Sequence, residues 1–283
     1  MFILRLLSSL FIISVVFSAL FVKGIPGRVI FSSICVFLSF FAVYEYLTIL
    51  SRIGKDSYKI FTCIFSSLIL LSITVFSLIR PQFFFLLFAL FVVISWIFIL
   101  CGKERIKVIE KTIISLSGIF MVTFPLCFIA VLFMMGERDG LYGGRNLVLF
   151  LIAVTKMGDI GAYIIGISTS KLIPGGNHKI SPMISPKKSW EGTIGGLVFS
   201  ILASCILSKY LPLEISLNLP SSILMGVILF IGGFTGDLAE SSLKRAAEIK
   251  DSGNIIPGIG GVLDLLDSLL LNAPIFFFYI VLS

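Results

Sequence analysis

Residues 263–282 read LDLLDSLLLNAPIFFFYIVL, an apolar run that opens with two aspartates, Asp264 and Asp267. A helix of roughly 20 apolar residues is as long as the hydrocarbon core of a bilayer is thick. Eight similar runs precede it along the chain, at about 2–22, 29–50, 60–79, 82–101, 112–135, 146–169, 191–208 and 221–239. The chain is therefore expected to cross a membrane about nine times.

The composition supports this expectation. Of the 283 residues, 58% are hydrophobic and only 13% are charged, and the mean hydropathy is +1.12. A soluble domain carries about 25% charged residues, so the composition excludes an ordinary soluble protein. The runs lack the apolar–polar alternation of barrel strands, and helices satisfy their own backbone groups in lipid. We predict an all-α fold, a polytopic membrane helical bundle of about nine transmembrane helices.

The lysines and arginines predict the orientation of this bundle. Nine spans place 15 of the 22 on the side of the N-terminus and 6 on the other side, while Lys156 lies within a span. Positively charged loops stay preferentially in the cytoplasm. The N-terminus and the polar loops 170–190 and 240–262 are therefore expected to be cytoplasmic.

We expect a single integral membrane domain over 1–283, with two parts of different character. Residues 1–145, the first five helices, are plain and apolar, with one internal acid, Glu45, that can reach the interface from its span end. Residues 146–283, the last four helices, are expected to be the catalytic part. Acids and bases lie inside these spans or at their ends: Lys156, Asp159, Asp237, Glu240, Asp264 and Asp267.

Charges within a membrane span are costly and usually mark a functional site. Lys156 and Asp159 are three residues apart on one helical face, so a structural ion pair is an alternative for them. Glycines also become frequent in this part. Their small-xxx-small spacing permits close approach of helix backbones, and it occurs in the pairs Gly192/Gly196 and Gly232/Gly236.

Asp264 and Asp267 are three residues apart and follow the sequence PGIGG at 257–261. Both project from one face of a helical first turn. Paired carboxylates attract Mg²⁺, which binds one or two carboxylates together with water and phosphate oxygens. Glycines in the turn free the backbone to bend and expose N–H groups toward phosphate. Helix capping by acids is the alternative for these aspartates.

Basic residues accompany the acids on the expected cytoplasmic side. Three precede the glycine-rich turn, and two follow a Ser-Pro step in the loop 178–192: Lys244, Arg245, Lys250, Lys187 and Lys188. They suit a polyphosphate, although interfacial bases also serve topology or contact anionic lipid. Acids for a metal and bases for phosphate at a membrane face predict phosphoryl or nucleotidyl transfer to a lipid.

The stretch 241–268, SSLKRAAEIKDSGNIIPGIGGVLDLLDS, resembles the C-terminal signature of the phosphatidate cytidylyltransferases (CDP-diacylglycerol synthases). The upstream GDIGAY and ISPKKSWEG are similar to family patterns. Two positions depart from the usual signature, Ile259 between the glycines and Leu265 after the first aspartate. The matching elements are Ser241, Lys244, Arg245, Lys250, Asp251, Pro257, Gly258, Gly260, Gly261, Asp264, Asp267 and Ser268.

The resemblance implies an enzyme that joins CTP and phosphatidic acid to give CDP-diacylglycerol and pyrophosphate for phospholipid biosynthesis. It implies Mg²⁺, with two divalent ions, and a location in the bacterial cytoplasmic (inner) membrane with the active site facing the cytoplasm. A homodimer is implied as well, and no nucleic-acid partner is expected.

The roles that follow are expectations of the resemblance. The metal ligands are Asp264, Asp267, Asp237 and Asp159. The catalytic set comprises Asp264, Asp267, Lys244 and Lys250. The substrate-binding set comprises Arg245, Asp251, Lys187, Lys188, Gly258, Gly260 and Gly261. Two alternatives remain open, a CTP-dependent polyprenol or phytol kinase and a cation-coupled transporter.

Overall fold

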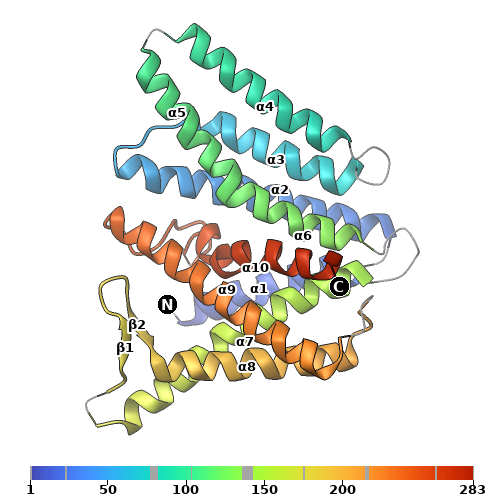
Figure 1. The fold of residues 1–283 in the computed structure, drawn as a ribbon, viewed down its shortest axis with the longest axis vertical. Helices are drawn as coiled ribbons and strands as arrows, with labels where there is room; N and C mark the ends of the chain where they lie inside the picture. Colours follow the sequence, from blue (N-terminus) through green and yellow to red (C-terminus); the bar gives the residue numbers. More distant parts are fainter. Residues whose placement is uncertain are drawn as a thin grey trace. The chain divides into compact units, whose positions relative to one another are not determined.

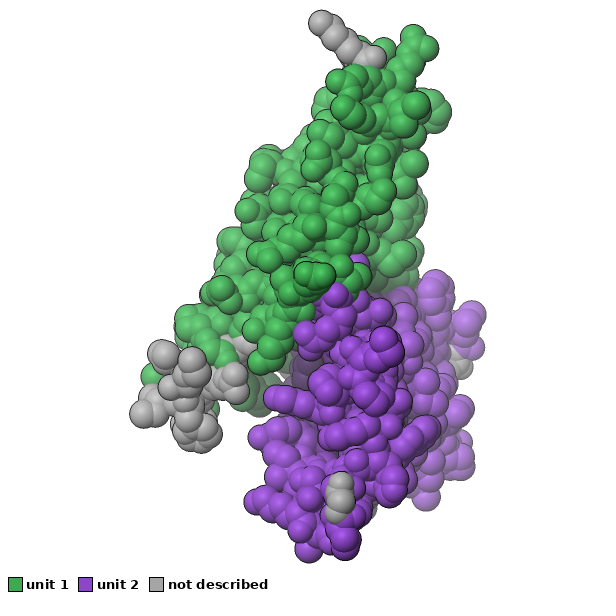
Figure 2. Space-filling model, turned by 90° about the vertical axis from the view of Figure 1, so that its left-hand side faces the viewer, with its two compact units in different colours: residues 1–134, 246–266 green, residues 135–245, 267–283 purple. Residues whose placement is uncertain are grey.

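The computed structural model describes residues 2–22, 24–76, 82–102, 104–135, 143–174, 176–213, 217–258 and 260–282. These residues are mostly helical, and the chain divides into two compact units. Unit 1 comprises Met1–Met134 and Ala246–Leu266, and unit 2 comprises Met135–Arg245 and Asp267–Ser283; Figure 2 colours them green and purple.

Unit 1 is built from antiparallel apolar helices with a central α2–α3 pair (Figure 1). Its elements are α1 (Phe2–Phe21), α2 (Gly24–Arg52), α3 (Lys59–Phe76), α4 (Gln82–Cys101), α5 (Arg105–Gly118), the π-helical turn η1 (Ile119–Thr123) and α6 (Phe124–Met134). Buried hydroxyls link three of them. Ser66 of α3 bonds to Ser39 of α2 and to Thr123 of η1, the latter at 2.7 Å. Such bonds satisfy polar groups in a membrane interior.

The π-helical turn has a local cause in the sequence. Pro125 lies in the first turn of α6, directly after η1. Proline has no N–H to donate to the carbonyl four residues earlier, and its ring clashes with that carbonyl. The wider π turn accommodates this break, so α5, η1 and α6 form one continuous helical stretch, Arg105–Met134.

Unit 2 contains α7 (Gly143–Leu172), β1 (Lys179–Ser181), β2 (Ser185–Ser189), α8 (Trp190–Tyr210), α9 (Leu219–Ala246) and α10 (Val262–Leu282). The first turn of α10 belongs to unit 1, and the rest of α10 belongs to unit 2. The antiparallel hairpin β1–β2 leads from α7 into α8 (Figure 1). Asn272 of α10 is fully buried and donates to Thr155 of α7 and to the Leu229 carbonyl of α9. One side chain therefore joins three helices of the unit.

The paired glycines lie where helix backbones meet, as their spacing indicates. A Cβ at Gly192 would lie 2.8 Å from the Ala162 carbonyl of α7, and one at Gly196 would lie 2.7 Å from the Gly158 carbonyl. A Cβ at Gly232 would collide with Asn272 of α10. Their absent side chains let α8 approach α7 and α9 approach α10.

The polytopic helical prediction is confirmed. By length and composition, six helical stretches of the described chain can cross a membrane: Gly24–Arg52, Arg105–Met134, Gly143–Leu172, Trp190–Tyr210, Leu219–Ala246 and Val262–Leu282. Shorter apolar helices lie on the three other predicted runs: Leu10–Phe21, Lys59–Val75 and Phe85–Cys101. The count of nine spans, the orientation and the single-domain organisation stay predictions.

Candidate active site

Three carboxylates from three helices of unit 2 are linked by electrostatic interaction with one of them, Asp267. They are Asp159 of α7, Asp237 of α9 and Asp267 of α10. Asp267 interacts electrostatically with both other aspartates and with Lys156. The Lys156 ammonium lies 3.2 Å from Oδ2 of Asp159, which forms the ion pair that their spacing indicates. Asp159 and Asp267 are more than 100 residues apart in the sequence, and the packing of α7, α9 and α10 brings the acids together.

Ser268 connects two of these acids. Its hydroxyl lies 2.9 Å from Oδ1 of Asp267 and 3.3 Å from Oδ2 of Asp159. Gly236 permits this arrangement, because a Cβ there would lie 2.5 Å from the backbone carbonyl oxygen of Asp267. Gly236 therefore lets the turn of α10 that carries Asp267 approach α9. Asp237 is the residue that follows Gly236 in α9.

Lys188 supplies a second cation to this cluster. Its ammonium lies 3.0 Å from Oδ2 of Asp237 and 4.4 Å above the ring centre of Phe234. The Lys188 side chain is only 17% exposed, so solvent screens the ion pair less than at an open surface. Lys187, its neighbour on β2, is exposed.

The hairpin that carries Lys188 is tied to α7 and α8 at its base. Asn177 donates to the Gly166 carbonyl at 2.7 Å, and Nδ1 of His178 lies 2.6 Å from Oε1 of Glu191. Ser189 caps α8 by accepting a hydrogen bond from the Gly192 amide. The sequence predicts a loop over 178–192, and the structure forms a hairpin there. Its strands are only three and five residues long, too short for a clear periodic pattern.

The predicted basic residues at the end of α9 have structural partners. Lys244 pairs with Glu240 at 3.1 Å, and both side chains are largely buried, at 12% and 7% exposed. Nε of Arg245 donates to the Ile184 carbonyl at 3.3 Å, which ties the hairpin turn to α9. The i, i+4 spacing of Glu240 and Lys244 indicates such a pair.

The glycine-rich turn belongs to unit 1. Gly258 and Gly260 have φ values of 78° and 130°, in the left-handed region that L side chains rarely adopt. The amides and carbonyls of Ile256 and Gly260 bond in both directions, at 2.9 and 3.1 Å, and close a tight turn. Ile259, one of the two departures, lies outside the described residues.

Asp264 caps the helix that follows this turn. Its Oδ2 accepts hydrogen bonds from the Gly261 amide at 2.8 Å and from the amide and hydroxyl of Ser252 at 2.9 Å each. The first amides of a helix have no intrahelical acceptor, so a carboxylate in the first turn stabilises it. The capping alternative therefore accounts for Oδ2 of Asp264, whose role as a metal ligand stays a prediction. Lys250 and Asp251 are exposed just before the turn.

Glu45 of α2 is buried against the segment that carries the glycine-rich turn. It is 3% exposed rather than extended to the interface, and its Oε2 accepts hydrogen bonds from Ser252 and Leu263. Its position as a lone acid inside an apolar run of the plain N-terminal part was the available signal.

The acids of unit 2 suit a hard cation by their chemistry. Among the described residues, no group of three His, Cys, Asp or Glu side chains stands ready as a metal site. Mg²⁺, however, needs only one or two carboxylates, with water and phosphate oxygens completing its shell. Asp237 and Asp267 offer such oxygens, and the ammonium groups of Lys156 and Lys188 already offset negative charge there.

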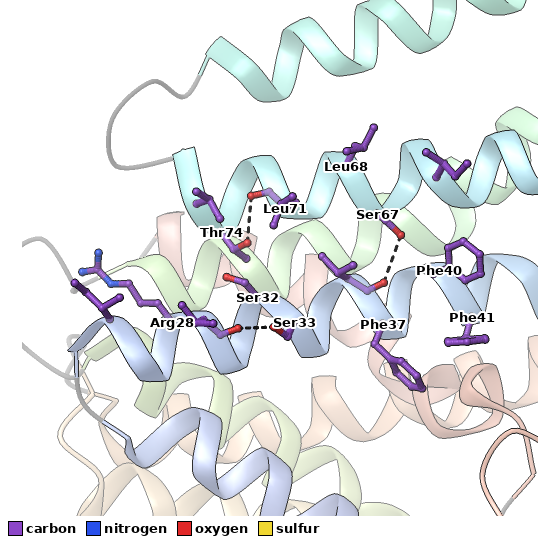
Figure 3. Close-up of a pocket in the computed structure, with 15 residues that line it drawn as sticks. Arg28, Ser32, Ser33, Phe37, Phe40, Phe41, Ser67, Leu68, Leu71 and Thr74 are labelled. Atoms are coloured by element: carbon purple, nitrogen blue, oxygen red, sulfur yellow. Dashed lines mark hydrogen bonds between the residues drawn. The ribbon is translucent and has the colours of Figure 1, made fainter.

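A groove of unit 1 is lined by none of the predicted site residues. It has a volume of about 890 Å³ between α2 and α3, with Arg28 at one end and Phe40 and Phe41 at the other (Figure 3). Two of its hydroxyls donate to backbone carbonyls: Ser33 to Val29 within α2, and Ser67 of α3 to Val36 of α2. The groove is apolar.

The sequence matches known proteins in two ways. The model of the Cytidylyltransferase family matches residues 3–283. Protein YnbB of Escherichia coli K12, described as uncharacterized, is 38% identical over 69% of this chain and 64% of its own. A Chlamydia muridarum protein named phosphatidate cytidylyltransferase is 37% identical over 59% of this chain and 54% of its own. One of the same name from Staphylococcus haemolyticus is 40% identical over 47% of this chain and 48% of its own.

The matched segments span about half to two thirds of these relatives' lengths. The family match, by contrast, covers nearly all of this chain and includes the three acid-bearing helices α7, α9 and α10. The chain belongs to the cytidylyltransferase family.

Proposed function

We propose that the protein transfers the cytidylyl group of CTP to phosphatidate, giving CDP-diacylglycerol and pyrophosphate in a membrane. The observation that carries this proposal is the meeting of Asp159, Asp237 and Asp267 from three helices beside Lys156 and Lys188. Family membership and the names of the bacterial relatives support the same reaction.

The chemistry requires positioning more than proton transfer. An oxygen of the phosphatidate phosphate attacks the α-phosphorus of CTP and forms the new P–O–P linkage. The bond from the α-phosphorus to the oxygen bridging to the β-phosphate breaks, and its electron pair leaves with pyrophosphate. The attacking phosphate is already anionic, so no side chain has to remove a proton. Charge compensation and alignment therefore dominate catalysis.

The residues of unit 2 divide this work. Asp237 and Asp267, with Asp159 beside them, would hold Mg²⁺, which when bound neutralises phosphate charge and orients the reacting oxygens. Lys188 projects from the hairpin toward the same place and suits a phosphate of the nucleotide. Lys187, Lys244 and Arg245 of unit 2 remain proposed phosphate contacts, as does Lys250 of unit 1. Two metal ions, a cytoplasmic location of the site and a homodimer are parts of the proposal.

The test uses the full chain purified in detergent, with phosphatidate vesicles and CTP labelled at either the α- or the γ-phosphate. Transfer of α-label to lipid, abolished by EDTA and by Asp267→Asn, is the expected result. The matched control is Ser200→Ala, which alters a buried hydroxyl of α8 that bonds the Gly226 carbonyl. This variant should retain transfer, because it lies outside the acid cluster.

Two results would overturn the proposal. Transfer of γ-label instead of α-label to a polyprenol or phytol acceptor would establish a lipid kinase. No labelled lipid from a folded, monodisperse wild type, together with cation-driven uptake into proteoliposomes, would favour the transporter alternative.

A further inference from the structure

The carboxylate of Glu45 is buried against the backbone of the segment 252–263, more than 200 residues later in the chain. Glu45 lies in the second half of α2, and both partners belong to unit 1 with it. From this geometry we propose that Glu45 is a positioning residue for the glycine-rich turn of the signature. The inference rests on the proposed function for its activity readout only.

The hydrogen bonds give Glu45 a defined task. Its Oε2 accepts from the Leu263 amide at 2.8 Å and from the Ser252 hydroxyl at 2.9 Å. Leu263 is the second residue of α10, so its amide has no acceptor within that helix. A side chain of α2 therefore provides part of the N-terminal cap of α10, and a negative charge is favourable there.

Asp264 completes the same cap from the other side. Its Oδ2 accepts from the Gly261 amide, and it shares the Ser252 hydroxyl with Glu45. The two carboxylates thus hold the segment around the glycine-rich turn through the Ser252 hydroxyl, the Gly261 amide just before α10 and the Leu263 amide within α10. Among the described residues, a variant without Glu45 keeps the hydrogen bonds of Asp264 and loses those of Glu45 to Ser252 and Leu263.

Two glycines show how closely the turn packs on Glu45. A Cβ at Gly253 or at Gly261 would collide with the Glu45 carboxylate. Neither residue has a positive φ, so close approach rather than backbone conformation accounts for glycine at these positions. The turn is built to receive this side chain.

Burial of a carboxylate among apolar helices is unfavourable unless hydrogen bonds compensate it. Bilayer crossing alone would favour an apolar residue at this position of α2. The hydrogen bonds of Glu45 to Ser252 and Leu263 therefore best explain an acid at this position. Through Ser252 and Leu263 it fixes the segment that contains Asp251, Gly258 and Gly260, three members of the predicted substrate-binding set.

The first experiment measures amide hydrogen exchange of the full chain in detergent, without substrate. In Glu45→Ala, peptides covering 252–263 should exchange about tenfold faster, as expected for the loss of a hydrogen bond to a charged group. Glu45→Gln keeps an acceptor oxygen and should stay within about threefold of the wild type. Ser252→Ala tests the same contact from the other partner if Glu45→Ala does not fold.

The matched control is Ser39→Ala, a buried position of the same helix whose hydroxyl bonds Ser66 of α3. It should change exchange in α2 and α3 and leave peptides 252–263 at the wild-type rate. In the transfer assay, Glu45→Ala should raise the KM for CTP by about tenfold, with Glu45→Gln restoring most of it. A purely structural defect would instead lower the active fraction and leave KM unchanged.

The outcomes separate this inference from the proposed function. Unchanged exchange of 252–263 in both Glu45→Ala and Ser252→Ala would overturn the positioning role, whatever the activity. Equally fast exchange in Glu45→Gln and Glu45→Ala would overturn positioning by the acceptor oxygen, because the loss of the negative charge would then account for the effect. An inactive wild type with Glu45-dependent exchange would contradict the proposed reaction and leave the positioning role standing.

Discussion

The ammonium group of Lys188 lies 3.0 Å from Oδ2 of Asp237, although the two residues come from a short β-hairpin and a long helix. Asp237 belongs to the acid cluster proposed to hold Mg²⁺. In the absence of metal, the lysine offsets part of the negative charge of that cluster. A metal ion and the ammonium group of Lys188 therefore compete for the Asp237 carboxylate, and Lys188 lies on the hairpin.

This competition predicts that Lys188→Gln changes both the Mg²⁺ dependence of the rate and kcat. The Mg²⁺ concentration that gives half the maximal rate should fall several-fold, because no ammonium group opposes the metal. The kcat should fall about 10- to 100-fold, because the nucleotide phosphates lose a preorganised cation. A magnesium titration of the transfer rate measures both. Lys171→Gln, at the exposed end of α7, is the control and should change neither quantity. An unaltered kcat would exclude a phosphate contact for Lys188.

Ser268 gives a second prediction, because its hydroxyl lies between Asp159 and Asp267. Ser268→Ala should lower kcat/KM about tenfold, as the loss of a hydrogen bond to a charged group suggests. Ser200→Ala removes an equally buried hydroxyl of α8 outside the cluster. Both variants should lose similar thermal stability, and only the first should lose rate. Equal rates in the two variants would show that Ser268 serves packing alone.

The acids of this candidate site can be singled out from the sequence because they are conspicuous in an apolar chain. Asp159, Asp237 and Asp267 stand out as charges within or beside spans, and the structure brings them together. Asp264 was grouped with Asp267 by helical spacing, yet its Oδ2 caps α10 in unit 1. Spacing gives the face of a helix and does not tell which partners meet that face.

Other features depend on tertiary contacts that leave no local pattern. The bond from Glu45 to Leu263 joins residues 218 positions apart, and nothing near Glu45 in sequence indicates it. The hairpin is held by Asn177 and Arg245, which reach it from outside its strands. Helices were easier to predict, since a long apolar run satisfies its backbone in only one way within lipid.

The close packing of α7 on α8 predicts a sharp difference between two glycines. A Cβ at Gly196 would lie 2.6 Å from the Phe230 ring and 2.7 Å from the Gly158 carbonyl, whereas one at Gly166 meets only ordinary contacts at 3.7 Å or more. Gly196→Ala should therefore lower stability by about 1–3 kcal/mol, as overpacking does. Gly166→Ala should be tolerated. Thermal melts in detergent compare the two, and equal melting temperatures would contradict the backbone approach.

The predicted orientation can be tested at the two ends of a single helix. Met183 is 90% exposed in the hairpin turn before α8, and Tyr210 is 73% exposed at the last residue of that helix. A helix of 21 residues is about 31 Å long, enough to place its ends on opposite sides of a bilayer. The charge distribution assigns the hairpin to the cytoplasm.

The orientation can be measured with two variants, Met183→Cys and Tyr210→Cys. Each is made in a background in which Cys101 and Cys205 are changed to Ser. The other three cysteines are buried. A membrane-impermeant maleimide should label the first variant in inverted vesicles only and the second in right-side-out vesicles only. The reverse pattern would place the hairpin, Lys188 and the acid cluster of unit 2 on the side without CTP. Because a CTP-dependent reaction needs cytoplasmic nucleotide, that result would contradict the proposed reaction as well as the orientation.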